Sequence, residues 1–277
     1  RANEIIKAQN PDKPMFLYLP FQNVHSPLEA PKEYIDKYSF ISDKKRRIHA
    51  AKVDYVDKAI GNITKALKGT GLWDDTILIF STDNGGIHLY GGYNWPLRGE
   101  KTTLWEGGVR GVAFVSGGRV PQKGVVRKEL LHVTDWYPTL IHLAGGSVYK
   151  ENPIDGFDVW KTIANGDPSP RTEILHNIDI KPSDGSGTTV YEGIALRMRD
   201  MKLMLKFESI IDVALYNISA DPTEHVDLSR QLPDTVQLMK SRVQDYMKTL
   251  VPPLNKPYDP KAYETAKKNG AWSPWQL

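Results

Sequence analysis

Two short apolar runs, separated by a long amphipathic pattern, constrain the fold of this chain most strongly. The first run, M-F-L-Y-L, occupies residues 15–19, and the second, T-I-L-I-F, occupies residues 76–80. Between them, residues 44–68 carry apolar side chains at three-, four- and seven-residue spacing, which predicts an amphipathic helix closed by Gly69 and Gly71. Apolar runs without alternation are typical of strands buried on both faces. Strand, helix and strand in this order predict a parallel sheet covered by helices.

Two further elements extend this alternation. Residues 109–115 predict a third short strand. Residues 135–143 predict a helix with Thr134 as its N-cap and Gly145 after its last turn. A hydroxyl side chain caps helix starts well, and glycine tolerates the left-handed backbone at helix ends. The first part of the chain therefore predicts an α/β architecture.

The character of the sequence changes at residues 165–170, where N-G-D-P-S-P consists of turn-forming residues. Beyond this point, strand-like segments follow one another without long helices between them, at residues 173–178, 192–198, 202–207 and 213–217. A helix at residues 233–250 and a proline-rich tail complete the chain. We therefore expect an α/β domain over residues 1–165 and a small α+β domain with an antiparallel sheet over residues 166–277.

Composition excludes several classes of protein and site. The 277 residues carry a net charge of +3 and include no cysteine, which excludes disulfides, thiolate metal sites and a cysteine nucleophile among these residues. So small a net charge predicts an ordinary solvated surface rather than a surface that binds nucleic acid. No apolar run approaches the ~20 residues of a transmembrane helix. Asn62 and Asn217 each open an N-x-[ST] triplet, so both are candidate N-glycosylation sites.

Functional side chains concentrate directly after the second apolar run. S-T-D-N-G-G occupies residues 81–86, and ligands of open α/β sheets bind beyond the carboxyl ends of strands. Asp83 and Asn84 offer adjacent carboxylate and amide oxygens, the hard ligands that Ca²⁺ and Mg²⁺ prefer. The alternative is an ordinary Asp-Asn-Gly turn, which these residues alone do not exclude. G-E-K-T, further along, lacks the spacing of a phosphate-binding loop, because Glu100 separates the glycine from the lysine.

Longer motifs give this region a specific resemblance. S-T-D-N-G-G, followed by N-W-P-L-R-G-E-K-T-T-L-W-E-G-G-V-R-G at residues 94–111, resembles the sulfatase family, and closely its arylsulfatase B branch. Q-N-V-H-S-P-L at residues 22–28 resembles the histidine loop of that branch. Matching motifs occur further along the chain, at residues 132–139, 155–160, 175–179 and 215–224. The resemblance covers nearly the whole chain in the expected order.

This resemblance implies an alkaline-phosphatase-like α/β sandwich with a small C-terminal domain that contains an antiparallel sheet. It implies that Asp83 and Asn84 are ligands of Ca²⁺, which offsets the negative charge of a bound sulfate. It also implies that Lys101 contacts the sulfate and that His25 stands near the leaving oxygen as a general acid. The nucleophile of the family is a formylglycine made from the cysteine of C-x-P-S-R.

The resemblance further implies hydrolysis of sulfate esters. The substrate is expected to be an aryl sulfate or a sulfated glycan, such as the 4-sulfate of N-acetylgalactosamine in dermatan or chondroitin sulfate, with a lysosomal or secreted location. Four side chains beside the motifs are candidate substrate contacts, namely His88, Trp95, Arg98 and Trp105. Two alternatives stay open, a glycan-binding relative without catalysis and a phosphoesterase of the same superfold.

The chain also departs from the pattern of the family. The C-x-P-S-R segment, an early acidic pair of metal ligands and the first strands of the sheet do not occur in these 277 residues. We expect them, and the formylglycine, in a missing N-terminal portion of the same fold. By itself the chain is expected to be inactive and to bind calcium weakly, because two ligands fall well short of the roughly six to eight that Ca²⁺ takes.

Overall fold

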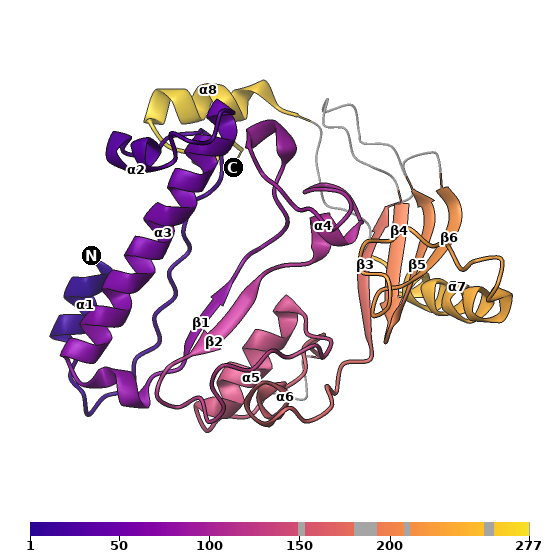
Figure 1. Ribbon diagram of the computed structural model, residues 1–277, viewed down its shortest axis with the longest axis horizontal. Coiled ribbons are helices and arrows are strands. Elements are labelled where there is room, and N and C mark those ends of the chain that lie inside the picture. Colours follow the sequence, from indigo (N-terminus) through magenta and orange to yellow (C-terminus); the bar gives the residue numbers. More distant parts are fainter. Residues whose placement is uncertain (149–152, 180–192, 208–210, 252–257, 277) are drawn as a thin grey trace.

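The computed structural model describes residues 1–148, 153–179, 193–207, 211–251 and 258–276. Helices α1 to α3 and α8 lie at one end of the molecule, a four-stranded sheet with helix α7 lies at the other, and strands β1 and β2 run between them (Figure 1). The α-helices are α1 Ala2–Ala8, α2 Lys32–Lys37, α3 Lys44–Gly69, α4 Glu106–Val109, α5 Trp136–Leu143, α6 Trp160–Asn165, α7 Pro233–Lys248 and α8 Pro260–Asn269. The 3₁₀ helices are η1 Leu72–Asp75, η2 His88–Tyr90 and η3 Val133–Asp135. The strands are β1 Leu78–Ser81, β2 Ala113–Ser116, β3 Glu173–Asp179, β4 Gly193–Met198, β5 Met201–Phe207 and β6 Ile211–Asn217.

Helix α3 forms where the spacing of apolar residues predicts it. Asp43 caps its start by accepting a hydrogen bond from the Arg46 N–H at 2.6 Å, and Gly71 takes the left-handed conformation, with φ of 75°, just beyond its end. Leu67 on its inner face packs with Ile6 of α1 in a small buried cluster. Because the caps and the apolar spacing are all local, the sequence is sufficient to predict this helix. No helix within the described ranges combines the length and apolarity that crossing a bilayer requires.

Strands β1 and β2 form a two-stranded sheet, and they pair antiparallel, with Leu78 opposite Ser116 and Ser81 opposite Ala113. The parallel sheet predicted from the two apolar runs is therefore wrong for the part of the chain that the structure describes. The loop of residues 82–112 joins the two strands and reverses the direction of the chain, so that β2 returns along β1. We call this segment the site loop.

The first apolar run is extended but does not form a strand. Phe16 and Tyr18 are 78% and 75% exposed, whereas Leu17 between them packs against the cluster around Ile6 and Leu67. The prediction of a strand buried on both faces was wrong because apolarity indicates that a run can be buried, but not which partner it pairs with.

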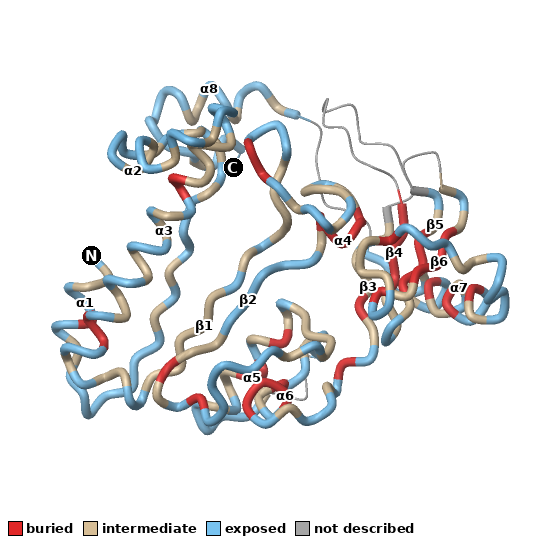
Figure 2. The backbone as a smooth tube through the Cα atoms, in the orientation of Figure 1, coloured by how far each residue is buried: buried red, intermediate tan, exposed pale blue. Residues whose placement is uncertain are grey.

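Strands β3 to β6 form an antiparallel meander in sequence order, which confirms the predicted antiparallel sheet. Residue 192, the predicted start of β4, lies outside the described residues. One face of the sheet packs on α7, and its buried core there consists of Ile194, Leu196, Leu203, Leu215, Val236, Met239 and Val243. The opposite face packs on the end of the site loop through Ala195, Met204 and Tyr216. Figure 2 shows buried residues along β4 and on α7. The face of the sheet opposite α7 therefore supports the end of the site loop.

Other differences from the predictions are local. The predicted strand over residues 109–115 is instead the end of α4 followed by β2. Helix α5 follows a 3₁₀ turn whose N-cap is His132 rather than Thr134, because His132 and Asp135 form a reciprocal capping box. Helices α1, α2, α6 and α8 were not predicted, and α8 lies within the segment interpreted as a proline-rich tail.

Candidate functional site

The site loop folds back on itself through backbone hydrogen bonds. The Gly85 N–H donates to the Gly108 carbonyl at 2.9 Å. The Asn94 side chain accepts a hydrogen bond from the Gly86 N–H and returns one to the Gly86 carbonyl, both at 2.9 Å. These bonds hold the start of the loop, which carries Asp83 and Asn84, against its middle and its end.

Close backbone approach explains the glycines of this loop. A Cβ atom on Gly85 would lie 1.7 Å from the Gly107 carbonyl oxygen, and a Cβ atom on Gly107 would lie 2.5 Å from the Arg98 carbonyl oxygen. Real side chains do not reach such distances from backbone atoms, so only glycine fits at either position. These glycines therefore allow the backbone near Gly85 and the backbone near Arg98 to pack directly against the backbone at Gly107.

Asp83 and Asn84 present oxygen ligands at the beginning of the loop. Asp83 is exposed, and one of its carboxylate oxygens accepts a hydrogen bond from the Asn84 N–H at 2.8 Å. The Asn84 amide nitrogen donates to the Gly85 carbonyl at 2.8 Å, which leaves the amide oxygen available to a cation. A carboxylate and an amide oxygen suit Ca²⁺. The set is nevertheless incomplete, since no cluster of three or more His, Cys, Asp or Glu side chains that could hold a metal occurs among the described residues.

Lys101 is joined through its backbone to the start of the site loop. Its backbone N–H donates to the Gly86 carbonyl at 3.2 Å, two residues beyond Asn84, and its side chain is half-buried. The next residue, Thr102, has a positive φ of 80°, a conformation that is unusual for a β-branched residue. The strained turn at Thr102 therefore follows directly after Lys101, the residue for which the family resemblance implies a sulfate contact.

His25 lies on a different loop, between the first apolar run and α2. Its ring is exposed, and Nδ1 lies 2.9 Å from the Ser26 carbonyl oxygen. Lys52 on α3 contacts the backbone of this loop, donating hydrogen bonds to the carbonyls of His25 and Pro27. Within the described part of the chain, no hydrogen bond or ion pair joins His25 to the site loop. Asp83, Asn84 and Lys101 thus belong to one loop whose segments are hydrogen-bonded together, whereas His25 lies on a separately anchored loop.

The candidate substrate contacts divide into exposed and buried residues. Trp95 is 74% exposed and could receive a sugar face. His88 is exposed but engaged, because Glu100 accepts hydrogen bonds from its backbone N–H at 2.7 Å and its ring at 2.6 Å. Trp105 is only 2% exposed and packs edge-on against the ring of Tyr216, so the expectation that it contacts substrate does not fit its position.

Arg98 is exposed and rigidly held. Its guanidinium lies 3.7 Å from the ring centroid of Trp105, and it donates to the Glu224 carbonyl at 3.3 Å. Stacking on an aromatic face fixes the plane of the guanidinium while leaving other N–H groups for a ligand. Arg98 therefore remains a candidate contact for an anionic group, with the buried Trp105 as its support.

A buried ionic cluster lies under the end of the site loop, and sequence reasoning missed it. The ammonium of Lys202 on β5 lies 3.0 Å from a carboxylate oxygen of Glu106 on α4 and 2.8 Å from one of Glu224. The other Glu224 oxygen accepts a hydrogen bond from the Glu106 N–H at 2.6 Å. Burial raises the pKa of Glu224, and the charge of Lys202 opposes that effect. Glu224 ends the motif at residues 215–224, but nothing in that motif indicates that its carboxylate pairs with Lys202 under the site loop.

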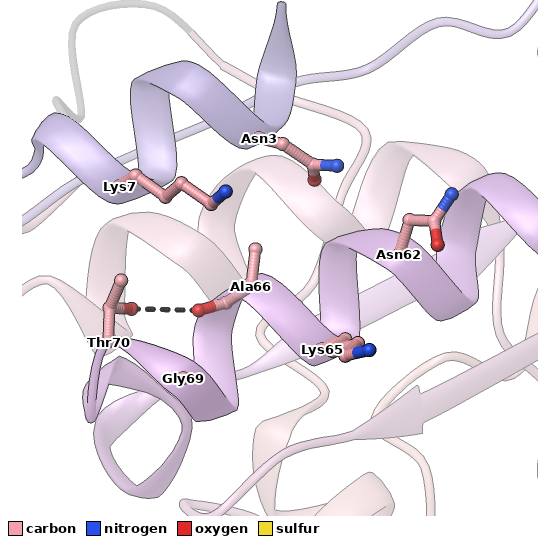
Figure 3. A pocket seen from close by; sticks show the side chains of 7 residues that line it. All are labelled: Asn3, Lys7, Asn62, Lys65, Ala66, Gly69 and Thr70. Carbon is pink, nitrogen blue, oxygen red and sulfur yellow. Dashed lines mark hydrogen bonds between the residues drawn. The ribbon is translucent and has the colours of Figure 1, made fainter.

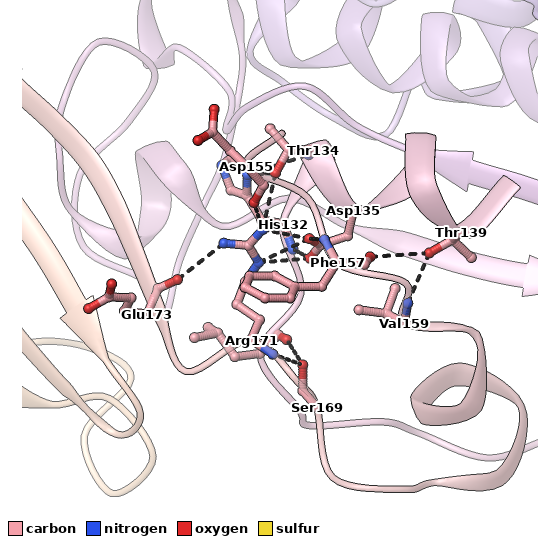
Figure 4. Close-up of polar contacts among 11 residues, drawn as sticks. His132, Thr134, Asp135, Thr139, Asp155, Phe157, Val159, Ser169, Arg171 and Glu173 are labelled. Atoms are coloured by element: carbon pink, nitrogen blue, oxygen red, sulfur yellow. Dashed lines mark hydrogen bonds and ion pairs between the residues drawn. The ribbon is translucent and has the colours of Figure 1, made fainter. Parts of the chain in front are cut away.

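A second buried pair organises the region before the four-stranded sheet (Figure 4). Arg171 donates to both carboxylate oxygens of Asp135, at 2.5 and 2.8 Å, and to the Asp155 carbonyl at 2.7 Å. Asp135 also accepts hydrogen bonds from the backbone N–H groups of His132 and Phe157, at 2.7 and 2.9 Å. All hydrogen-bonding positions of this carboxylate are engaged with protein groups. The motifs at residues 132–139 and 155–160 therefore meet in a structural joint rather than in a site.

The two predicted glycosylation sites lie outside the site loop. Asn62 is exposed on α3 and lines a hollow of about 490 Å³ between α1 and α3, together with Asn3 and Lys7 (Figure 3). Asn217 ends β6, and its side-chain oxygen accepts hydrogen bonds from the N–H groups of Ser219 and Ala220, both at 3.1 Å. The hollow contains none of the predicted catalytic or metal-binding residues.

Comparison with known proteins identifies relatives over the whole chain. The model of the sulfatase family matches residues 1–147. The chain is 41% identical over 312 residues to arylsulfatase J of Mus musculus, covering 99% of this chain and 52% of that relative. It is 30% identical over 169 residues to human N-acetylgalactosamine-6-sulfatase, covering 60% of this chain and 31% of that relative. The solved structure of Ps i-CgsB in complex with k-i-k-neocarrahexaose aligns with a TM-score of 0.78 at 27% identity, covering 88% of this chain and 52% of that one. The chain thus spans about half the length of the mouse relative, and its fold is the alkaline-phosphatase-like fold of sulfatases.

Proposed function

The chain belongs to the sulfatase family, and from this premise we propose that the protein hydrolyses sulfate esters. The observation that carries the proposal is the layered site loop. The hydrogen bond from the Lys101 N–H to the Gly86 carbonyl ties the backbone of Lys101 to the segment that begins with Asp83 and Asn84, so one loop carries a cationic residue and two residues with oxygen ligands. A cation and a metal-ligand pair on one rigid loop suit an anionic ester that accumulates charge during cleavage.

Each proposed residue has a distinct role. Asp83 and Asn84 would hold part of the coordination shell of Ca²⁺, which supplies positive charge to the sulfate oxygens. Lys101 would contact a sulfate oxygen as a compact point charge. His25 would protonate the leaving oxygen, because imidazole transfers protons readily near neutral pH. The formylglycine nucleophile of the family belongs to C-x-P-S-R, a motif that does not occur in the 277 residues.

We further propose a glycan as the substrate, namely the 4-sulfate of N-acetylgalactosamine in dermatan or chondroitin sulfate. The arylsulfatase B-like motifs support this assignment, together with the exposed Trp95 and the fixed guanidinium of Arg98, both within the site loop. An aromatic face and a planar cation match a sugar ring that carries anionic groups. We also propose a lysosomal or secreted location with glycosylation at Asn62 and Asn217.

The test expresses the longest reading frame that contains residues 1–277, together with an enzyme that generates formylglycine. Turnover is measured on 4-nitrocatechol sulfate, on 4-nitrophenyl phosphate, and on 4-sulfated and 6-sulfated chondroitin disaccharides. We expect sulfate ester hydrolysis that requires Ca²⁺ and favours the 4-sulfate. Lys101→Ala should lower kcat/KM by about 100-fold or more, the effect of removing one group that stabilises transition-state charge. Lys123→Ala is the matched control, since Lys123 is an exposed lysine outside the site loop.

Three other outcomes would redirect the proposal. Preference for the phosphate ester would make the protein a phosphoesterase of the same superfold. Binding of the sulfated disaccharides without turnover would make the protein a glycan-binding relative. This is the second candidate, because the chain contains no cysteine from which a formylglycine could be made. Hydrolysis of the 6-sulfate in preference to the 4-sulfate would retain the reaction and refute the substrate.

A further inference from the structure

Lys52 is a buried lysine directly beneath the histidine loop. It is only 2% exposed, although it lies on α3, where the other lysines of the same helix, such as Lys58, are exposed. Its ammonium donates hydrogen bonds to two backbone carbonyls, that of His25 and, at 2.8 Å, that of Pro27. No carboxylate forms an ion pair with it among the residues that the structure describes. Burial lowers the pKa of Lys52, and the nearby charge of Glu29 opposes that effect.

A buried ammonium without a carboxylate partner is unfavourable unless its hydrogen bonds are well satisfied. Here the acceptors are the carbonyls on either side of Ser26, so a single side chain fixes two points of one tight loop. The backbone adds two more restraints, since the His25 N–H donates to the Gln22 carbonyl and the Glu29 N–H donates to the Pro27 carbonyl, both at 3.0 Å. Lys52 thus joins the loop to the rigid helix α3.

The Ser26 carbonyl lies between these two acceptors in the chain, and its contact with the His25 ring bears on which ring nitrogen carries the proton. Nδ1 of His25 lies 2.9 Å from the Ser26 carbonyl oxygen, and a carbonyl oxygen only accepts hydrogen bonds. The Ser26 hydroxyl, which could donate to Nδ1, lies farther away, at 3.4 Å. The shorter contact favours a proton on Nδ1, which leaves Nε2 as the nitrogen that can take up or release a second proton toward a ligand. The hydrogen bond made by one ring nitrogen sets the tautomer available at the other.

We propose that Lys52 is a positioning residue that holds the Ser26 carbonyl in place, and thereby keeps the His25 ring in the tautomer whose Nε2 faces substrate. Lys52 does not contact substrate in this proposal, and it acts only through the backbone of residues 25–27. The proposal rests on the proposed function insofar as it assigns a catalytic purpose to His25. The tautomer itself is a property of the chain and can be measured without any substrate.

The first measurement is NMR of the 277-residue chain labelled with ¹⁵N. The ring nitrogen shifts of His25 should report a neutral form protonated at Nδ1, and Lys52→Met should shift the ring toward the form protonated at Nε2. Lys52→Arg, which retains donors, should preserve the wild-type pattern. Lys58→Met, at an exposed position of the same helix, should change nothing. An unchanged His25 tautomer in folded Lys52→Met would overturn the proposal.

A measurement on the wild-type chain covers the case in which Lys52→Met does not fold. The ammonium protons of Lys52 should exchange with solvent at least about tenfold more slowly than those of Lys58, because buried hydrogen-bonded groups exchange only after local opening. Equal exchange rates would also overturn the proposal.

The second readout is turnover of the expressed reading frame described above. Lys52→Met should lower kcat by about tenfold or more with KM changed by less than about twofold, and Lys52→Arg should recover most of the loss. If the wild-type protein hydrolyses no sulfate ester, the proposed function fails while the NMR result still decides the role of Lys52. If hydrolysis occurs and kcat is unaffected in Lys52→Met, the positioning role fails and the function stands.

Discussion

Replacing Lys202 with methionine should destabilise the chain strongly, because it removes the cation of a buried cluster. Lys202 is 0% exposed, and its ammonium lies 3.0 Å from Glu106 and 2.8 Å from Glu224. The contact with Glu224 is an ion pair without well-directed hydrogen-bond geometry. In Lys202→Met, Arg197 would remain 3.9 Å from Glu106.

Removal of one partner from a buried ion pair costs about 3–5 kcal/mol, because the other charge stays buried without compensation. Two carboxylates lose their partner here, so we expect the upper part of that range, about 4–5 kcal/mol, at pH 8. Adding Glu224→Gln removes one of the two uncompensated charges, while the glutamine oxygen can still accept the hydrogen bond from the Glu106 N–H. The double variant should therefore recover at least about 1 kcal/mol relative to Lys202→Met.

The pH dependence of this variant has a definite sign. Burial already raises the pKa of Glu224, and loss of the Lys202 charge should raise it further. A carboxyl whose folded pKa is raised binds more protons in the folded state than in the unfolded state. Stability then falls as pH rises from the unfolded pKa through the folded pKa. Lys202→Met should accordingly lose less stability at pH 5 than at pH 8.

Urea unfolding followed by far-ultraviolet circular dichroism measures these differences as free energies of unfolding. Lys58→Met is the matched control, because Lys58 is exposed on α3 and methionine is a good helix former. Its free energy of unfolding should stay within about 0.5 kcal/mol of wild type. A loss below about 1 kcal/mol for Lys202→Met at pH 8, or further destabilisation on adding Glu224→Gln, would refute the cluster as a source of stability.

Two further predictions concern backbone packing and acid stability. Gly85→Ala should destabilise the chain by more than about 3 kcal/mol in urea unfolding, since the new Cβ would lie 1.7 Å from the Gly107 carbonyl oxygen. Gly61→Ala in the interior of α3 should instead stabilise the chain by about 0.5–1 kcal/mol, because no atom lies within 4 Å of the new Cβ. Equal effects of the two substitutions would contradict this reasoning. Burial is the chief reason why the pKa of His176 lies well below its usual 6.5. Below pH 6.5 the unfolded chain therefore binds a proton at this residue that the folded chain does not bind. The free energy of unfolding should accordingly fall as pH falls below 6.5. His176→Leu should reduce that slope by up to about 1.4 kcal/mol per pH unit in the same assay, and an unchanged slope would show that another group controls it.

Local signals account for the elements that the sequence predicts correctly. Helix α3 carries its own apolar spacing and its own caps at Asp43 and Gly71. Strands β3 to β6 follow one another closely, so neighbours in sequence become neighbours in the sheet. The extended run around Leu17 carries the same kind of apolar signal as β1, but its pairing depends on distant residues. Apolarity therefore predicted a buried strand in both cases, but Phe16 and Tyr18 are exposed and β1 pairs antiparallel with β2.

Helix α4 shows why a distant contact can override local preference. Its four residues include Gly107 and Gly108, which disfavour helix, and nothing in the local sequence predicts it. Its first N–H group, that of Glu106, donates to the side chain of Glu224, which lies 118 residues further along the chain. A long-range carboxylate thus satisfies the start of this helix, as a local capping residue would do elsewhere.

The motif residues and the residues that anchor them differ in how the sequence reveals them. Asp83, Asn84 and Lys101 lie on one loop, so their motif places them together without knowledge of the fold. Lys52 and Lys202 occur in ordinary helix and strand segments, where a lysine is expected at the surface. Both are buried, and each connects a loop with candidate catalytic or substrate contacts to a rigid element, Lys52 to α3 and Lys202 to the four-stranded sheet. Because a buried ammonium is tolerated only where its hydrogen bonds or counter-ions are secured, these two lysines indicate where the architecture restrains the loops.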